Sequence, residues 1–476
     1  MSIRNNYILN LAGSVIPVGI SLITIPIYLR LIGESRYGIL TIFWLILGYM
    51  GLFDIGLGRA AAQRIAALKN DMGNRREQAF WTALTMSCAM GIMASLIAWV
   101  ACNYSSVSIF KYTDITQNEI DVVLIYLIVA LPMVTLSSVL VGALQGQEAF
   151  LELNAVSVFG SIIFQILPII SATFFGRDLR FVLPAALFAK ITTMGLLFYF
   201  SKLRIVRGDK IELNIDEAKK MIQFGGWVTV TSIIGPLMVA LDRLIIGTIW
   251  GAKAVTYYTI PFQLAERSTL ISNSLSSALF PKFTNLSKKD VVALAVDAQK
   301  LLILIMTPLI ILGIYMVNPF LEWWIGIDFS KNVGDVGIIL LMGFWINSLA
   351  IIPYSQLQGG GRPDLVAKCH MAELLPYCVF LYWMLNAFGL IGAAIVFSIR
   401  ALIDFALLSY FTSTLKKSFK IISIPFLQII LAYTNSAGNQ TLDIYWNQFA
   451  MLQLIVFVVW LYKSFPKTYI VKILKY

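Results

Sequence analysis

Charged side chains are scarce in this sequence: Asp, Glu, Lys and Arg together make up only 13% of its 476 residues. Soluble globular proteins carry about 25% charged and about 45–50% apolar residues. Here the hydrophobic share is 59% and the mean hydropathy is +0.80. A surface of this size could not be covered for water with so few charges. The composition therefore excludes a soluble domain, a disordered chain and a fibrous protein, and it predicts an integral membrane protein.

Histidine and cysteine are almost absent as well. The single histidine is His370, and the four cysteines, Cys88, Cys102, Cys369 and Cys378, form no CxxC or CxxH spacing. These counts argue against a disulfide framework, a zinc site and a Ser–His–Asp triad. We therefore expect no metal, no cofactor and no catalytic residue.

Acidic residues are outnumbered, with 25 Asp and Glu against 36 Lys and Arg, and the net charge is +11. In a soluble protein such a balance can indicate nucleic-acid binding. In a membrane protein, basic residues collect on cytoplasmic loops and set the topology, so we expect no nucleic-acid partner. The N-terminal apolar stretch runs on through Leu31 without the small-residue cleavage site of a signal peptide, and we expect this helix to stay in the mature protein.

Long apolar runs fill most of the chain. A helix needs about 20 mostly apolar residues to cross a bilayer, and on this basis we predict an all-α polytopic membrane protein with about fourteen transmembrane helices. The predicted spans are Tyr7–Leu31, Tyr37–Gly58, Phe80–Ala101, Val122–Gly142, Leu153–Phe175, Phe181–Phe200, Phe224–Trp250, Val255–Leu279, Leu301–Val317, Val336–Leu357, Val366–Ala387, Leu390–Phe411, Ile421–Tyr433 and Trp446–Tyr462. The last two are short.

The basic residues of the loops fall mainly on one side of this map. With the N-terminus inside, 25 Lys and Arg lie in inward segments, 7 in outward loops and 4 within spans. This asymmetry predicts cytoplasmic N- and C-termini. Since no loop exceeds about two dozen residues, neither face has room for a soluble catalytic domain.

Two halves of the chain repeat one another. The tripeptide LQG follows a span at Leu144–Gly146 and again at Leu357–Gly359, and the sequence around Gly33 is similar to that around Gly251. The alternative to a duplication is chance similarity between apolar segments. A duplication predicts two pseudo-symmetric six-helix lobes around a central cavity, as in alternating-access transporters. We expect lobes at 1–203 and 222–415, a basic cytoplasmic linker at 204–221, and an extra helix pair with a basic tail at 416–476.

Polar residues recur at helical spacing on two spans. They are Asn10, Ser14, Ser21 and Thr24 on the first and Gln263, Arg267 and Ser274 on the eighth. Helix–helix packing is the usual role of small hydroxyl residues in membranes, and a polar cavity lining is the other interpretation.

Four basic residues lie inside spans, where a charge facing lipid is costly. We interpret Arg267, Arg243, Lys190 and Arg400, together with Arg59 at the inner end of span two, as the lining of a cationic cavity. Arg donors match phosphate geometry, so such a cavity suits an anionic headgroup. The alternative is neutralisation by neighbouring carboxylates.

Acidic residues in or near spans are candidates for carrying a proton or a sodium ion in coupled transport. The candidates are Asp242, Asp54, Glu266 and Asp404. Pairing with Arg59 is the alternative role for Asp54. Arg400 and Asp404 are one helical turn apart, a distance that also suits a structural ion pair.

Three stretches carry a resemblance to a known family. LFDIGLGRAAAQRIA from Leu52, LDRLIIGTIWG from Leu241 and SSALFPKF from Ser276 resemble the bacterial polysaccharide flippases of Wzx type, in the multidrug/oligosaccharidyl-lipid/polysaccharide exporter superfamily. The stretch around Arg267 also resembles span eight of lipid II flippases, whose cavity arginine would fall on that residue. Those relatives also carry cavity arginines on span one, whereas this sequence has no arginine between Arg4 and Arg30.

The resemblance implies an O-antigen or other surface-polysaccharide flippase of the bacterial inner membrane. Its cargo would be an undecaprenyl-pyrophosphate-linked oligosaccharide, moved from the cytoplasmic to the periplasmic leaflet without making or breaking a bond. Implied partners are membrane lipids, H⁺ or Na⁺, and the polysaccharide polymerase and chain-length machinery. Three alternatives stay open: a multidrug or small-molecule exporter of the same superfamily, a membrane glycosyltransferase such as a polymerase or ligase, and a non-catalytic membrane scaffold.

Overall fold

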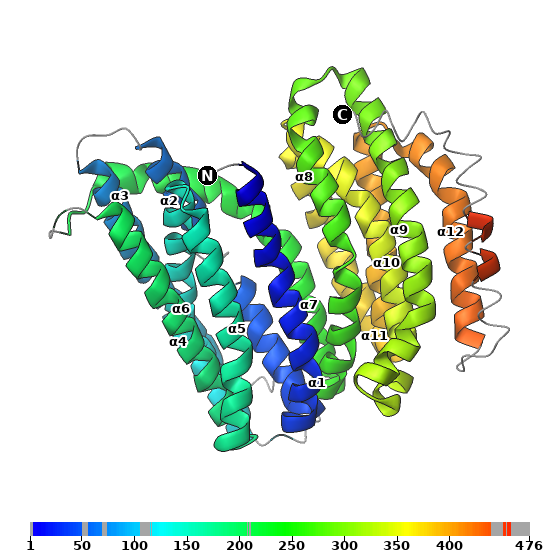
Figure 1. The fold of residues 1–476 in the computed structure, drawn as a ribbon, viewed down its shortest axis with the longest axis horizontal. Coiled ribbons are helices and arrows are strands. Elements are labelled where there is room, and N and C mark those ends of the chain that lie inside the picture. Colours follow the sequence, from blue (N-terminus) through cyan, green and yellow to red (C-terminus); the bar gives the residue numbers. More distant parts are fainter. Residues whose placement is uncertain are drawn as a thin grey trace. The chain divides into compact units, whose positions relative to one another are not determined.

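The computed structural model describes residues 3–49, 56–68, 74–104, 115, 117–206, 208, 211–438, 451–453 and 455–457. Within these ranges the regular structure is helical (Figure 1). The helices are α1 (Ile3–Tyr49), α2 (Leu57–Ala67), α3 (Arg75–Tyr104), α4 (Gln117–Gly146), α5 (Phe150–Phe174), α6 (Leu179–Ile205), α7 (Ile215–Glu266), α8 (Thr269–Asn285), α9 (Lys288–Trp324), α10 (Ile327–Gly359), α11 (Pro363–Phe411) and α12 (Leu415–Gly438).

Eight helical stretches among the described residues are long and apolar enough to cross a membrane. They lie in α1, α3, α4, α5, α6, α9, α10 and α11. The prediction of an all-α multi-pass membrane protein is thereby confirmed. Many large apolar side chains on these helices are exposed, such as Phe188, Leu375 and Val379, and they supply the surface that lipid covers.

Three of the helices each hold two predicted spans and change direction at a glycine. Gly33 in α1 has φ 80°, Gly251 in α7 has φ 82° and Gly389 in α11 has φ 61°. Positive φ is open to glycine and strained for other residues. The predicted turns at Gly33 and Gly251 also share their ψ angles, 168° and 176°, so the similar sequences around these glycines adopt the same local backbone.

The chain forms two compact units, residues 1–256 and 257–476. In the first, α2, α3 and α4 bury an apolar core that includes Leu57, Phe80 and Leu144. In the second, α10 is the central helix, packed against α8, α9 and α11. The Trp345 indole nitrogen of α10 donates to Thr307 Oγ1 at 3.1 Å, which satisfies a polar atom inside this core.

Glycines let the short helices α2 and α8 approach their neighbours closely. A Cβ added at Gly142 in α4 would lie 1.9 Å from the Gly58 carbonyl oxygen in α2. The two LQG glycines have matching settings, because Gly146 abuts Ala62 of α2 and Gly359 abuts Phe283 of α8. Both tripeptides end a long helix against a short one.

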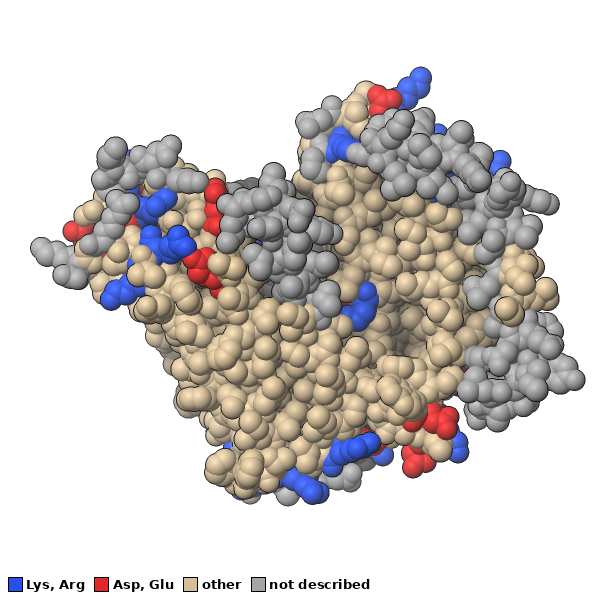
Figure 2. All heavy atoms as spheres, in the orientation of Figure 1, with Lys and Arg blue, Asp and Glu red and all other residues tan. Residues whose placement is uncertain are grey.

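On the face that Figure 2 shows, charged side chains lie mainly near the ends of the helices in each unit. The surface along the middle of the helices is largely uncharged there. In the first unit, polar contacts join segments that the predicted topology assigns to the same side. Arg36, Glu119 and Leu179 meet among the outward segments. Arg64 and Glu217 meet among the inward ones.

Several helices, such as α9 and α10, extend beyond the predicted spans, and two predicted spans are interrupted. Span two was expected to continue to Gly58, but Gly56 has a left-handed conformation and α2 begins at Leu57; residues 50–55, which follow α1, lie outside the described residues. The predicted span Val255–Leu279 is interrupted between α7 and α8, where backbone bonds of the i to i−3 type run from Arg267 and Ser268. The last predicted span, Trp446–Tyr462, falls mostly outside the described residues.

Candidate functional site

Lys190 of α6 is a basic residue inside a membrane span. Its ammonium nitrogen lies 4.9 Å from the ring centroid of Phe164 in α5. The side chain is half-buried, and no carboxylate pairs with it among the described residues. A cation over an aromatic face is stabilised by about 0.5–2 kcal/mol, less than full neutralisation would supply. The Lys190 ammonium group is thus without an anionic partner among the described residues.

The Phe164 ring belongs to an aromatic cluster within the first unit. Its centroid is 5.7 Å from that of Trp44, which packs edge-on against Tyr28 and Tyr37 at 5.5 and 6.2 Å. The Trp44 indole nitrogen is buried without a hydrogen-bond acceptor. Buried polar groups without a partner are rare in proteins. This part of the unit thus places a cation and an unpaired hydrogen-bond donor beside a cluster of aromatic rings.

The polar face of the first span is used largely for packing. Thr24 is 4% exposed, and its hydroxyl lies 3.2 Å from Gln165 Oε1 of α5. The Tyr28 hydroxyl donates to the Gln165 carbonyl at 2.6 Å. Ser21 bonds to the carbonyl of Val18 in its own helix. The helix-packing interpretation therefore fits Thr24. Asn10 and Ser14 belong to α1, but their side chains lie outside the described residues, as does Asp54.

Asp242 and Arg243 are buried side by side in α7, at 1% and 2% exposure. Each takes part in a polar or electrostatic interaction. Neither side chain is open to solvent, and their predicted roles in a cationic cavity and in ion coupling stay predictions.

Arg267 occupies the break between α7 and α8, and its side chain is exposed. No ion pair joins it to a carboxylate of the described chain. Backbone bonds of the i to i−3 type replace the regular α-helical pattern at Arg267 and Ser268, and Ser268 keeps helical φ and ψ of −60° and −27°. Gln263 stays in α7, whereas Ser274 lies in α8 and bonds to the Leu270 carbonyl. Glu266 ends α7 and has an interaction of its own.

Arg59 and Arg64 lie five residues apart in α2 and have different environments. Arg59 is exposed and takes part in an interaction. Arg64 Nε lies 2.6 Å from Glu217 Oε2, and a second nitrogen lies 2.8 Å from Oε1. Burial of Glu217 opposes its ionisation, but hydrogen bonds from Arg64 and Lys220 outweigh burial and hold the pKa of this carboxyl below its ordinary value.

Arg400 lies in the second limb of α11, beyond Gly389. Its guanidinium carbon is 5.6 Å from the Tyr377 ring and 5.5 Å from the Phe397 ring. Asp404, one turn further, has its Oδ1 atom 3.3 Å from His370 Nε2 in the first limb. Both limbs thus contribute charged groups to one cluster.

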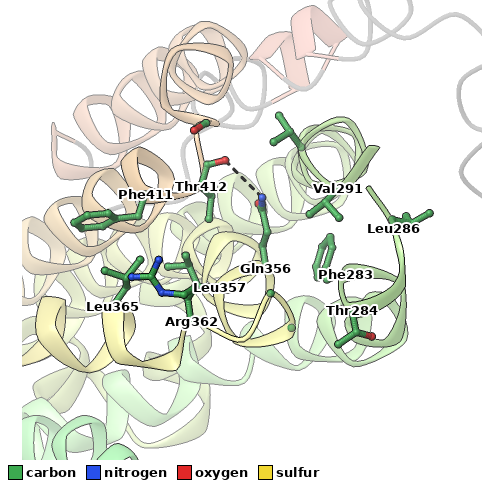
Figure 3. Close-up of a pocket in the computed structure, with 14 residues that line it drawn as sticks. Phe283, Thr284, Leu286, Val291, Gln356, Leu357, Arg362, Leu365, Phe411 and Thr412 are labelled. Carbon is green, nitrogen blue, oxygen red and sulfur yellow. Dashed lines mark hydrogen bonds between the residues drawn. The ribbon is translucent and has the colours of Figure 1, made fainter. Parts of the chain in front are cut away.

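A cavity of about 510 Å³ opens where α8 and α9, α10 and α11, and α11 and α12 are joined. Figure 3 shows Gln356 and Thr412 facing one another across it, with the Gln356 amide nitrogen 3.5 Å from the Thr412 carbonyl oxygen. Phe283 and Leu286 give it an apolar wall, and Arg362 lies at its edge. Its lining includes Gly359, the LQG glycine of the second unit.

More than half of the sequence matches a known family. The profile of the family described as polysaccharide biosynthesis protein covers residues 3–287. The chain belongs to this family. It is 29% identical over 413 residues to a protein named as an O-antigen transporter from Shigella flexneri, covering 86% of this chain and 97% of that one. The predicted resemblance to Wzx-type flippases is confirmed.

Two solved structures have the same fold as this family member. One is the lipid II flippase MurJ in an inward closed conformation, with a TM-score of 0.71, 14% identity, and coverage of 96% of this chain and 99% of that chain. The other is an inward-facing multidrug resistance MATE transporter of the MOP superfamily, with a TM-score of 0.65, 15% identity, and coverage of 86% and 99%. The relatives are transporters and flippases by name, in agreement with the prediction that the chain is not an enzyme.

Sequence reasoning missed some of the residues that shape these sites. Gln165 was not predicted, although a glutamine in the apolar span Leu153–Phe175 was a visible signal. The pairing of Arg64 with Glu217 was not predicted either, because 153 residues separate them and both looked like ordinary loop charges.

Proposed function

We propose that the chain moves an undecaprenyl-pyrophosphate-linked oligosaccharide, an O-antigen or other surface-polysaccharide repeat unit, from the cytoplasmic to the periplasmic leaflet. Sugars and pyrophosphate do not cross about 30 Å of hydrocarbon unaided, so such cargo needs a polar, cationic path. The family and the name of the Shigella relative support this cargo class.

The observation that carries the proposal is Lys190, a cation inside a membrane span that has an aromatic neighbour and no carboxylate partner within the described chain. A charge at this depth costs about 2.5–3.5 kcal/mol on insertion scales. A structural role would be better served by a neutral residue, so a role in binding an anionic cargo explains why a lysine is present. Arg267, exposed at a helix break, supplies a second such group. Broken helices in transporters are typical of substrate sites.

The remaining parts of the mechanism follow from this proposal. Two lobes, 1–203 and 222–415, rock about a cationic central cavity so that it opens alternately to the two faces. The isoprenoid tail stays in lipid while the pyrophosphate contacts the basic groups. The termini are cytoplasmic, the membrane is the bacterial inner membrane, H⁺ or Na⁺ drives the cycle, and the polymerase and chain-length machinery receive the product.

A multidrug transporter and a lipid II flippase both have this fold, so the fold alone does not distinguish a drug from a lipid-linked glycan as the cargo. The charges favour the glycan, because Lys190 and Arg267 have no carboxylate partner among the described residues, and they would attract a pyrophosphate and repel a cationic cargo.

The test uses the purified full chain in vesicles that contain a fluorescently labelled undecaprenyl-pyrophosphate oligosaccharide. A membrane-impermeant quencher reports how much label reaches the outer leaflet. Wild type should equilibrate the label, and Arg267→Ala should slow it while Arg267→Lys retains part of the rate. Export of a labelled organic cation at the wild-type rate, with no movement of the glycan lipid, would instead support the multidrug alternative.

A further inference from the structure

Glu373 in the first limb of α11 is a buried carboxylate without hydrogen-bond partners. It is 7% exposed, and neither of its oxygens has a donor within reach. It lines a cavity of about 390 Å³ between the two limbs of α11, whose walls are otherwise mostly apolar, with Pro376, Phe380 and Ile403 among them. An ionised carboxylate in such a setting lacks both water and hydrogen bonds, so a neutral form is strongly favoured.

A small set of titratable groups surrounds Glu373. Arg400 lines the same cavity, and Asp404, His370 and Cys369 lie within electrostatic range. From α10, Tyr354 stacks on the His370 ring at 6.4 Å. Among the described residues, no group of three His, Cys, Asp or Glu side chains is arranged to hold a metal ion.

The charges of this cluster balance only when it holds one proton. Glu373 and Asp404 are two potential anions, whereas Arg400 is one permanent cation. With the proton on Glu373, the Asp404 carboxylate and the Arg400 guanidinium cancel. With the proton on His370, the imidazolium and the guanidinium together cancel both carboxylates. Since the apolar walls penalise net charge, these two states are the favoured ones.

The two proton positions differ in access to water. The His370 side chain is 19% exposed, and it lies seven residues from the start of α11 at Pro363. Glu373 lies about one turn deeper and is more buried. His370 is therefore the entry, and Glu373 is the inner position.

We propose that His370, Asp404 and Glu373 form a one-proton relay between the limbs of α11. A proton from water protonates the His370 imidazole beside Asp404. Once a side-chain rotation or an intervening water connects the imidazolium to Glu373, its N–H bond breaks as an O–H bond forms on Glu373, which leaves a neutral imidazole and a neutral acid. A sodium ion is disfavoured because hard cations require several oxygen ligands and Arg400 repels them. The link between this relay and cargo movement rests on the proposed function, but the relay itself does not.

Infrared difference spectroscopy of the reconstituted full chain tests the relay directly. At neutral pH, wild type should show the C=O stretch of a protonated carboxylic acid, shifted on exchange into D₂O. The band should be lost in Glu373→Gln, which mimics the neutral acid in shape, and kept in Glu322→Gln, which alters an exposed carboxylate. In His370→Ala the band should remain and exchange more slowly. Absence of the band in wild type, or its persistence in Glu373→Gln, would overturn the relay.

Vesicles with the labelled glycan lipid then test its coupling to transport. A pH gradient should accelerate movement of the label in wild type and in Glu322→Gln but not in Glu373→Gln, and a sodium gradient alone should have no effect. A wild-type response to sodium alone would overturn proton coupling. If the acid band behaves as expected but no protein moves the label, the relay stands and the proposed cargo is wrong.

Discussion

Arg64 and Glu217 form a two-point ion pair between α2 and the start of α7, with nitrogen–oxygen distances of 2.6 and 2.8 Å. Glu217 is 3% exposed and also accepts a hydrogen bond from Lys220 at 3.2 Å. The pair joins residues 153 positions apart. It thereby fixes the short helix α2 against the segment that follows the linker.

This pair should make stability depend on pH. The pKa of Glu217 is lowered in the folded protein, so its contribution is present above the ordinary carboxyl value of about 4.3 and is lost as the pH falls through the folded value. Thermal unfolding of the detergent-purified chain, followed by tryptophan fluorescence, should show a smaller loss of stability on acidification in Glu217→Gln than in wild type. Parallel pH profiles would contradict this assignment.

A double-mutant cycle should measure the interaction energy of the same pair. Arg64→Ala and Glu217→Ala should each lower the free energy of unfolding by about 1–3 kcal/mol, because each leaves a charged partner unsatisfied. The double variant should cost clearly less than the two single losses added together. Additive losses would mean that the two side chains stabilise the fold independently.

The helix crossing between α2 and α4 depends on Gly142. A methyl group at this position would lie 1.9 Å from the Gly58 carbonyl oxygen, and backbone cannot move away cheaply. Gly142→Ala should therefore destabilise the first unit by at least about 1–3 kcal/mol, seen as a lower midpoint of heat-induced aggregation. Gly195→Ala in α6 is the matched control, because a methyl group there meets nothing within 4 Å. Equal midpoints for the two variants would exclude a tight crossing.

Lys190 should show opposite effects on stability and on transport. Lys190→Met removes a charge that has no carboxylate partner in the described chain. The free energy of unfolding should therefore increase by up to about 2.5–3.5 kcal/mol, and the midpoint of unfolding should rise. The same change should slow movement of the labelled glycan lipid. Lys253→Met is the control, because Lys253 pairs with Glu34 at 2.9 Å, and this variant should gain no stability. A destabilised Lys190→Met protein would indicate a structural role.

Gly33 and Gly251 should respond alike to substitution. Both have φ near 80° with ψ of 168° and 176°, a region essentially restricted to glycine, where a residue with a side chain costs about 1–3 kcal/mol. No atom lies within 4 Å of a Cβ placed at Gly33, so the cost there is one of backbone conformation alone. Gly33→Ala should lower the unfolding midpoint modestly, and Gly251→Ala should do so by at least as much. An unchanged midpoint in both would show that the turns adapt.

The membrane class, most helix positions and the glycine turns followed from composition and hydropathy, since a bilayer imposes length and apolarity on each span. The break at Arg267 did not, because the surrounding AERST contains neither proline nor glycine to signal it. The polar face of span one was visible in the sequence, yet spacing could not reveal that Thr24 meets Gln165, which is 141 residues away. Glu373 is visible in the sequence as an acidic residue within a predicted span, but its isolation from hydrogen-bond donors is a property of the packed helices.

The direct turns at Gly33, Gly251 and Gly389 join consecutive crossings with hardly any intervening chain. In the predicted topology, in which the spans alternate across the bilayer, all three turns are expected on the side opposite the N-terminus. That face accordingly has little slack, and an epitope tag or reporter inserted at any of these glycines should abolish folding. The connection between Ile205 and Ile215, on the other face, should accept one. Insertion mapping should therefore find many tolerated positions on the side of the N-terminus and few on the opposite side of the bilayer.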